Sequence, residues 1–239
     1  MSAPLADRLR PQTLDDVVGQ RHLLAEGKAL RRIIDSGQIP NMVFYGPSGV
    51  GKTTLARVLC GLQKNDSGTV LLQGKALAEK QRRKCSYMVM QDVNHQLFTE
   101  DVLDELLLSM DSEDEKENTE RANQILSSLD LADKIKLHPM SLSGGEKQRV
   151  AIGSAIASNK EILFFDEPTS GLDYFHMVEV SDNLNRLKDM GKSLFLITHD
   201  PELIYKCCTY LLFIQENKVL WHRPMDDEAI KLLRAFFSH

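Results

Sequence analysis

The amino-acid sequence predicts an α/β protein in which helices flank a mainly parallel β-sheet, with a helical subdomain and a small, incomplete antiparallel β subdomain. Three observations predict this class. Short apolar runs alternate with segments of helical periodicity from residue 42 onward, a pattern typical of parallel sheets. A glycine-rich loop joins the first run to a helix in "MVFYGPSGVGKTTLA". The 239 residues, 42% of them hydrophobic, suffice for one large domain with a buried core.

The predicted elements follow the chain in order. Apolar periodicity with a glycine stop predicts a helix at 27–37. Residues 99–131 are helical in pattern and contain the acidic run "DSEDEKENTE", which we interpret as a solvated loop and helix start; docking of a partner is the alternative. Two β-rich runs, "TYLLFI" and "KVLWH", flank a Glu-Asn turn and precede a C-terminal amphipathic helix. Further helices are expected at 52–62, from 143 and at 174–190, and strands at 42–45, 69–72, 86–90, 161–165 and 193–197.

Charge and cysteine usage narrow the class of function. A net charge of -5 supplies no global basic field for nucleic acid. The 4 cysteines form no CxxC pair, which favours reduced thiols in a cytosolic chain. No apolar stretch approaches the length of a membrane span, and the N-terminus lacks an apolar signal core. We therefore expect a cytoplasmic protein that reaches a membrane only through a partner.

The glycine-rich loop has the spacing G-x-x-x-x-G-K-[ST] between a strand and a helix, which predicts a P-loop NTPase. Glycines let the loop amides point inward, and the helix N-terminus adds positive potential for phosphates. Lys52 would reach the β and γ phosphates, and Thr53 would bind magnesium. The predicted phosphate-binding residues are Gly46, Pro47, Ser48, Gly49, Val50, Gly51, Lys52, Thr53 and Thr54.

Acidic residues follow the apolar strand in "ILFFDEPTSGLD". Carboxylates at the carboxyl end of a parallel strand lie where α/β sheets bind ligands. Asp166 is therefore expected to hold magnesium, and Glu167 is the candidate base for water. His199, at the end of "LFLITHD", could contact the γ-phosphate. We expect the strand before Asp166 to lie beside the phosphate-loop strand.

A second anion-binding helix start is predicted in "LSGGEKQRVAIGSAIA". Ser143, Gly144 and Gly145 would expose backbone amides and a helix dipole to a phosphate. One chain already has a phosphate loop, so this motif suggests that two chains share each nucleotide.

From residue 59 to the C-terminus the chain resembles an ATP-binding-cassette (ABC) ATPase, most similar to the energy-coupling-factor type. The resemblance rests on "GLQKNDSGTVLLQG", "VMQDVNHQLFTEDVLDEL", "LSGGEKQR", "LFFDEPTSGLD" and "LITHD". It implies ATP and Mg²⁺ as cofactors, with Gln91 as the loop glutamine serving metal and catalysis. It also implies a head-to-tail homodimer with Asp173 in the inter-subunit loop, and a transmembrane transporter subunit as partner.

Residues 1–58 instead resemble the start of an AAA+ ATPase of the replication-associated, clamp-loader-like group. The segment "RLRPQTLDDVVGQ" implies that Val18 and Gly19 lie close to adenine, and no Phe, Tyr or Trp precedes Phe44 to stack on the base. The sequence thus predicts a hybrid with a junction at Gly49–Leu59 and a single P-loop domain whose helical subdomain covers about 95–145. The strand at 68–74 would lack its partners and form an edge or a rearranged small sheet.

These patterns lead to one main functional prediction and several alternatives. We expect an ATP-binding domain with slow, dimer-dependent hydrolysis of ATP to ADP and phosphate. The alternatives are a working ATPase subunit of an ABC or energy-coupling-factor importer, a DNA-processing AAA+ motor, and a designed protein that has no biological partner. The acidic net charge argues against nucleic acid as a partner.

Overall fold

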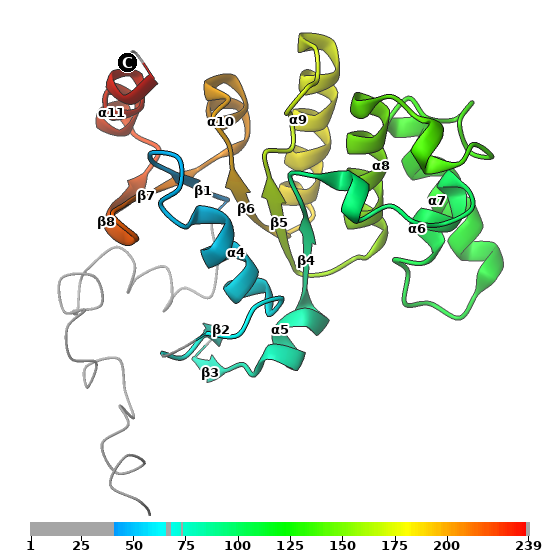
Figure 1. Ribbon diagram of the computed structural model, residues 1–239, viewed down its shortest axis with the longest axis horizontal. Helices are drawn as coiled ribbons and strands as arrows, with labels where there is room; N and C mark the ends of the chain where they lie inside the picture. The colour runs from blue at the N-terminus through cyan, green and yellow to red at the C-terminus, as the bar shows by residue number, and fades with distance from the viewer. Residues whose placement is uncertain (1–40, 66–67, 73, 238–239) are drawn as a thin grey trace, which may run out of the picture. The chain divides into compact units, whose positions relative to one another are not determined.

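The computed structural model describes residues 41–65, 68–72 and 74–237. A six-stranded sheet with flanking helices forms the main unit (Figure 1). Its strands are β1 (Met42–Tyr45), β4 (Ser86–Val89), β5 (Ile162–Asp166), β6 (Ser193–Ile197), β7 (Tyr210–Gln215) and β8 (Lys218–Pro224). Its helices are α4 (Lys52–Cys60), α5 (Glu79–Cys85), α6 (Val102–Leu107), α7 (Glu115–Ser128), α8 (Gly144–Ala157), α9 (Tyr174–Asp189), α10 (Pro201–Cys207) and α11 (Asp227–Phe237), with 3₁₀ turns η2 (Val93–His95) and η3 (Pro139–Ser141).

The strand order is β4-β5-β6-β1-β7-β8, and every neighbouring pair is parallel except the β7–β8 hairpin. The predicted mainly parallel α/β class is confirmed. However, the expectation that β1 lies beside the Asp166 strand is wrong, because β6 pairs with both β1 and β5 and separates them. Parallel strands are joined by crossovers, so the chain pattern alone does not state which strands are neighbours.

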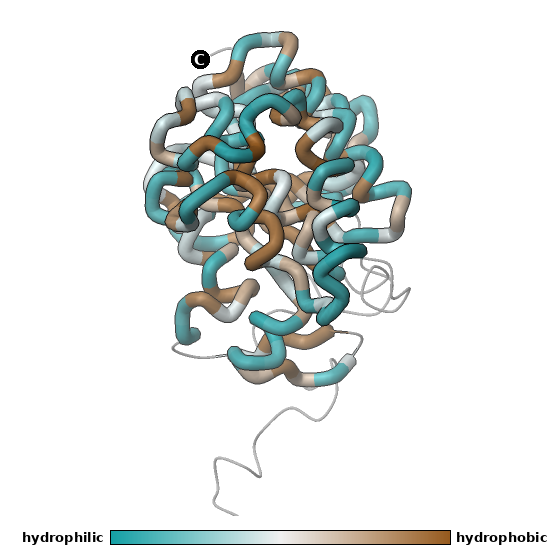
Figure 2. The backbone as a smooth tube through the Cα atoms, turned by 90° about the vertical axis from the view of Figure 1, so that its right-hand side faces the viewer, coloured by the Kyte–Doolittle hydropathy of each residue, from teal (hydrophilic) through white to brown (hydrophobic). Residues whose placement is uncertain are grey.

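Helices cover the sheet and complete its core. Helix α4 packs against β4, β5 and β6 and lies in front of the sheet in Figure 1. Helix α8 contacts β4, and α9 contacts β6. Phe165, Leu194 and Leu196 of the central strands are fully buried. Figure 2 shows the hydrophobic backbone stretches gathered in the middle of the main unit, as expected for strands buried on both faces.

The region between β4 and β5 contains more separate helices than the sequence pattern indicates, because residues 99–131 form two helices, α6 and α7. Its elements α6, α7 and α8 pack on one another through side chains that include Leu106, Leu126 and Val150. The acidic run forms a loop and the start of α7, whose N-cap is Asp114; the carboxylate accepts from the backbone N–H groups of Lys116 and Glu117. The solvated loop and helix start are therefore confirmed.

A separate small sheet pairs β2 (Leu71–Leu72) with β3 (Lys75–Ala76) as an antiparallel hairpin. Residues 71–76 belong to a different compact unit from the six-stranded sheet. The predicted strand at 69–72 is shorter than expected, and a small antiparallel sheet forms here, as expected. The helix predicted at 27–37 lies outside the described residues.

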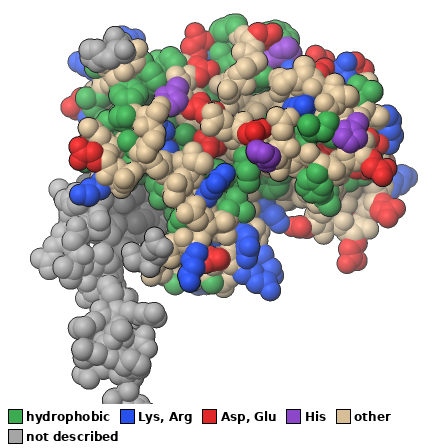
Figure 3. Space-filling model, in the orientation of Figure 1, with side chains coloured by type: hydrophobic (Ala, Val, Ile, Leu, Met, Phe, Trp, Pro, Cys, Tyr) green, Lys and Arg blue, Asp and Glu red, His purple; other side chains and the backbone are tan. Residues whose placement is uncertain are grey.

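The basic cluster of α5 and the length of the helices are relevant to which partners the chain could contact. Figure 3 shows Lys and Arg side chains gathered over α5, where Arg83 and Lys84 are exposed. Arg82 is instead buried and donates to the Asn65 side chain at 3.2 Å, so this local basic cluster is partly structural. Within the described part of the chain, no helix is both long and apolar enough to cross a membrane.

Candidate functional site

The phosphate loop leaves the carboxyl end of β1 and enters α4. Gly46, Gly49 and Gly51 adopt φ angles of 144°, 78° and 84°, values that side chains rarely tolerate. A Cβ atom on Gly46 would lie 1.9 Å from the carbonyl oxygen of Ile214, so this position requires glycine. Within the described part of the chain, the amides of Gly49, Val50 and Gly51 donate to no backbone carbonyl. The loop therefore offers several unsatisfied donors at the start of a helix, as an anion cradle requires.

Lys52 is folded back over this loop. Its Nζ donates to the carbonyl oxygens of Gly46 at 2.7 Å and Pro47 at 2.8 Å, and the residue is buried. Burial lowers the pKa of the ammonium group, while the nearby carboxylates of Glu167 and Asp166 act in the opposite direction. A buried cation that donates to two carbonyls and lies close to two carboxylates is suited to receive a polyanion.

Asp166 ends β5, one strand away from β1, and is buried with 3% of its surface exposed. Burial raises the pKa of its carboxyl group, and a hydrogen bond from the Thr53 side chain lowers it in part. A hydroxyl and a carboxylate are hard oxygen ligands of the kind that Mg²⁺ prefers. No group of three or more His, Cys, Asp or Glu side chains in the described residues could hold a metal alone, so a magnesium ion here would depend on phosphate oxygens as well.

Glu167 follows in a left-handed conformation with φ of 50°. Its backbone N–H donates to Ile197 O at 2.7 Å, and its Oε2 accepts from the backbone N–H of His199 at 3.2 Å. The His199 Nε2 lies 3.6 Å from Glu167 Oε1. Burial raises the pKa of Glu167, and the His199 backbone bond opposes that rise. A strained backbone held by the neighbouring strand end thus aims a partly buried carboxylate, a feature that recurs at functional sites.

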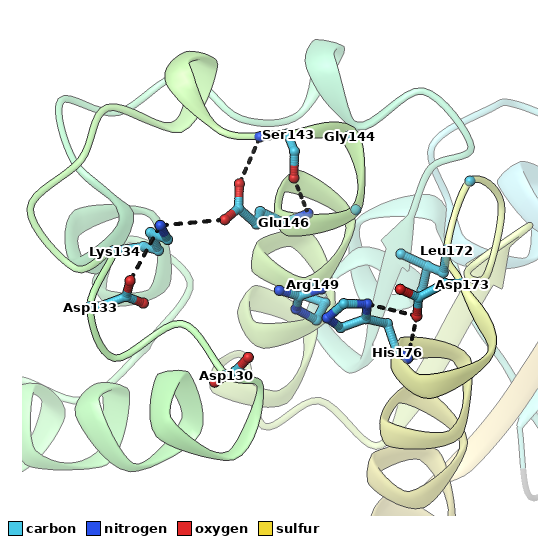
Figure 4. A pocket seen from close by; sticks show the side chains of 12 residues that line it. Asp130, Asp133, Lys134, Ser143, Gly144, Glu146, Arg149, Leu172, Asp173 and His176 are labelled. Atoms are coloured by element: carbon cyan, nitrogen blue, oxygen red, sulfur yellow. Dashed lines mark hydrogen bonds and ion pairs between the residues drawn. The ribbon is translucent and has the colours of Figure 1, made fainter.

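The "LSGG" motif lies at a second place, a pocket of about 740 Å³ (Figure 4). Ser143 is the N-cap of α8: its Oγ accepts from Glu146 N at 3.4 Å, and Glu146 Oε2 accepts from Ser143 N at 2.8 Å. This capping box fixes the helix start. Gly144 has open space where a Cβ would be, whereas a Cβ on Gly145 would lie 3.1 Å from the Leu172 side chain.

Asp173 faces this pocket from the start of α9 (Figure 4). Its Oδ1 accepts from His176 N at 2.9 Å and lies 2.8 Å from His176 Nδ1. The backbone hydrogen bond from His176 lowers the pKa of Asp173, so the carboxylate stays charged. Arg149 and Lys134 add cationic groups to the lining. The pocket thus combines the N-terminus of α8 with charged side chains from α8 (Arg149), the start of α9 (Asp173) and the segment between α7 and η3 (Lys134).

The structure brings together one group of predicted residues and leaves another apart. Lys52, Thr53, Asp166, Glu167 and His199 meet at the carboxyl edge of the sheet. None of these residues lines the pocket that contains the "LSGG" motif. Within one chain, the two anion-binding features are therefore separate.

Gln91 is exposed, two residues after the end of β4 at Val89. The segment that follows it is tied to α8, because Lys147 Nζ donates to Asn94 Oδ1 at 3.0 Å. Val18 and Gly19, predicted near adenine, lie outside the described residues.

Several residues of these sites were missed by sequence reasoning. Lys134 lines the pocket but belongs to no motif with a recognisable spacing. Arg149 and His176 line it too, and Arg149 was not singled out although it is the last residue of the quoted motif "LSGGEKQR". For His176 a signal existed: its spacing three residues after Asp173 matches a capping pair at a helix start. The contact between the β7–β8 hairpin and the phosphate loop left no signal in sequence spacing.

Comparison with known proteins gives a consistent result. A family model described as "ABC transporter" matches residues 33–170. A putative ABC transporter ATP-binding protein of Treponema denticola is 44% identical over 176 residues, 73% of this chain and 35% of that protein. An uncharacterized ABC transporter ATP-binding protein of Methanocaldococcus jannaschii is 35% identical over 78% of this chain and 86% of its own length. The methionine import ATP-binding protein of Bacillus subtilis is 35% identical over 78% of this chain and 57% of that protein.

Solved structures agree with these relatives. The cbiO1 protein of Clostridium perfringens, part of the ABC transporter complex cbiONQ, superposes with a TM-score of 0.68 at 25% identity, covering 83% of this chain and 84% of that one. A dimeric ATP-binding cassette in a post-hydrolysis state, bound to ADP and Pi, gives 0.70 at 25% identity, covering 80% and 86%. The chain spans only 35% and 36% of the two Treponema denticola relatives.

The comparisons also bear on the predicted hybrid. The family match begins at residue 33 and continues across Gly49–Leu59, where the junction with an AAA+-like segment was predicted. These matches give no support to an AAA+ or chimeric assignment.

Proposed function

The chain belongs to the ABC transporter family of ATP-binding proteins, and from this premise we propose that it binds MgATP and hydrolyses it to ADP and phosphate as the ATPase subunit of a membrane transporter. The observation that carries the proposal is the meeting of Lys52 with the two carboxylates, Asp166 and Glu167, at one edge of the sheet. The buried ammonium, the open loop amides and the Thr53–Asp166 pair fit a magnesium-bound triphosphate.

Each residue has a separable role in this proposal. Lys52 exchanges its two carbonyl partners for phosphate oxygens, and the loop amides hold the remaining phosphate charge. Thr53 and Asp166 would hold the magnesium ion, which would neutralise charge on the phosphates. Glu167 accepts a proton from the attacking water, and its backbone bonds to Ile197 and His199 fix its direction. His199 would orient the γ-phosphate, and Gln91 would contact the metal and the water.

Dimerisation completes the site in this proposal. The "LSGG" helix start and Asp173 lie in a pocket apart from the phosphate loop, which supports their acting on the nucleotide of a second copy. A transmembrane subunit is the second partner, by analogy with relatives described as import ATP-binding proteins. Hydrolysis of ATP is therefore expected to be slow and to depend on dimerisation.

ATP binding and turnover test the proposal directly. With Mg²⁺ present, Lys52→Ala should weaken ATP binding roughly tenfold to a hundredfold, because a charge-assisted contact is lost. Glu167→Gln should retain binding and lower turnover at least about a hundredfold, because the base is removed. Equilibrium binding of a fluorescent ATP analogue and phosphate release measure the two effects.

Matched controls separate these effects from loss of charge in general. Lys80→Ala and Glu202→Gln alter exposed residues outside the site and should leave both measurements unchanged. ATP binding that is indifferent to Lys52 would refute the proposal. Unaltered turnover in Glu167→Gln would remove Glu167 from the role of base.

The resemblance of residues 1–58 to AAA+ proteins gains no support from the comparisons, because the ABC transporter match begins at residue 33 and includes the phosphate loop. The domain division at residue 58 stays a prediction, and the match from residue 33 argues for a single ABC-type domain that includes β1.

A further inference from the structure

The turn between β7 and β8 packs directly against the phosphate loop. Strand β1 has β6 on one side and β7 on the other, and because β7 is parallel to β1, both end at the same edge of the sheet. A Cβ on Gly46 would collide with the carbonyl oxygen of Ile214, and a Cβ on Gly51 would lie 3.5 Å from Asn217 Oδ1. The end of the hairpin, from Ile214 to Asn217, therefore borders the phosphate loop on the side away from β6.

This turn keeps two polar side chains in a conformation that favours glycine. Glu216 and Asn217 have φ angles of 50° and 58°, as in the two-residue hairpin turns for which Asn-Gly is preferred. The register of the hairpin shifts between Phe213 and Ile214, and irregularities of this kind redirect strands next to functional sites. Asn217 is exposed, and within the described residues its carboxamide makes no hydrogen bond.

The direction of the bound nucleotide follows from the catalytic side. Glu167 and His199 come from the ends of β5 and β6, so the γ-phosphate lies toward that side of the loop. The nucleoside must extend the opposite way, toward β7 and its turn. We propose that Asn217 is a specificity-determining residue that hydrogen-bonds the sugar hydroxyls of the nucleotide, including the 2′-hydroxyl. This inference rests on the proposed function, since it requires that the loop binds a nucleoside triphosphate.

The chemistry of the turn favours sugar over phosphate as the group contacted. A carboxamide both donates and accepts hydrogen bonds, which matches a hydroxyl. The neighbouring Glu216 carboxylate would repel phosphate oxygens but can accept from hydroxyl groups, as acidic residues do with ribose in dinucleotide sites. A turn that combines both groups therefore suits the uncharged part of the ligand.

The variant Asn217→Gly removes the carboxamide and suits the left-handed backbone, so the turn is expected to keep its shape. The dissociation constants of ATP, 2′-deoxy-ATP and inorganic tripolyphosphate, each with Mg²⁺, would be measured for this variant and for the unaltered protein. We expect the unaltered protein to bind ATP roughly threefold to tenfold more tightly than 2′-deoxy-ATP. In Asn217→Gly that preference should vanish, with tripolyphosphate binding unchanged.

Controls make failure of this inference distinguishable from failure of the proposed function. Asn159→Gly changes another asparagine of positive φ, 52°, in a part of the chain outside this site, and should alter none of the three constants. Equal loss of tripolyphosphate and ATP binding in Asn217→Gly would overturn the inference, because the residue would then shape the phosphate loop. An unchanged preference for ATP would also overturn it. If the unaltered protein binds neither ATP nor tripolyphosphate, the proposed function itself fails and the inference falls with it.

Discussion

Among the described glycines, Gly46 is the one at which an added Cβ would come closest to a neighbouring atom. Replacement by Ala would place a methyl group 1.9 Å from the Ile214 carbonyl oxygen at a φ of 144°. We expect Gly46→Ala to lower the free energy of unfolding by at least about 3 kcal/mol, because the backbone of the phosphate loop and that of β7 at Ile214 must move apart. Gly49→Ala is the matched control: it has a φ of 78° but nothing within 4 Å, so only the strain of about 1–2 kcal/mol applies. Urea unfolding of both variants measures the difference, and equal losses would contradict the clash.

Asp101 gives a pH-dependent prediction at the same scale. It caps α6: Oδ1 accepts from Asp104 N at 2.9 Å and Oδ2 from Lys136 Nζ at 2.9 Å. Partial burial alone would raise the pKa of Asp101, but these hydrogen bonds outweigh it and hold the pKa below its ordinary value of 3.8. The carboxylate therefore stabilises the fold above that pH, and its contribution is lost as pH falls through the lowered pKa.

The variant Asp101→Ala should reduce the free energy of unfolding by about 1 kcal/mol near neutral pH. Urea titrations at a series of pH values would measure the difference in free energy of unfolding between the unaltered protein and Asp101→Ala. This difference should be constant well above pH 3.8, the ordinary pKa of the carboxyl group, and should become smaller below it. Asp101→Asn keeps the cap and loses the ion pair, so its free energy of unfolding should lie between those of the unaltered protein and Asp101→Ala. A difference that widens in acid would show that the charged form does not carry the stabilisation.

At the scale of elements, a buried carboxylate fixes the segment between β4 and α6. Glu105 is 4% exposed, and its Oε2 accepts from Phe98 N, Thr99 N and Thr99 Oγ1 at 2.8–3.0 Å. We expect Glu105→Ala to cost about 3 kcal/mol, because two backbone donors lose their partner. Amide hydrogen exchange at residues 96–101 should accelerate. Glu105→Gln retains one acceptor oxygen and should show a smaller increase; unchanged exchange in both variants would mean that the segment is held by other contacts.

The helices and strands show which features of the fold can be predicted from the sequence. Strand 193–197 and the hairpin turn at Glu216–Asn217 match their predicted places, because local apolar runs and turn residues determine them. The phosphate loop was found from spacing alone, since the chemistry of its backbone requires glycines at fixed positions. Strand order was not recoverable: β6 between β1 and β5 depends on long-range pairing. For the same reason, the approach of Asn217 to Gly51 became visible only in the folded chain.

At the scale of the whole molecule, the separation of the two anion-binding features is the property to explain. The phosphate loop with its carboxylates forms one feature, and the pocket with Ser143, Gly144 and Asp173 forms the other. A head-to-tail pair of chains with two-fold symmetry would place each pocket against the loop of its partner, giving two equal composite sites. Turnover should then rise more than linearly with protein concentration.

Mixing two inactive variants tests this arrangement. Lys52→Ala disables the loop of its own chain, whereas Gly144→Asp would set a carboxylate against the phosphates of the partner's nucleotide. Gly144 has open space for a side chain, and an acidic residue in the first turn of α8 is favourable for the helix, so this variant should fold. In a mixed dimer one site contains both defects and the other contains neither. Each variant alone should be nearly inactive, and a 1:1 mixture should recover about a quarter of the unaltered turnover, because half of the dimers would carry one intact site. If phosphate release by the mixture is no higher than the mean of the separate variants, each chain must hydrolyse ATP with its own residues, and the pocket needs another explanation.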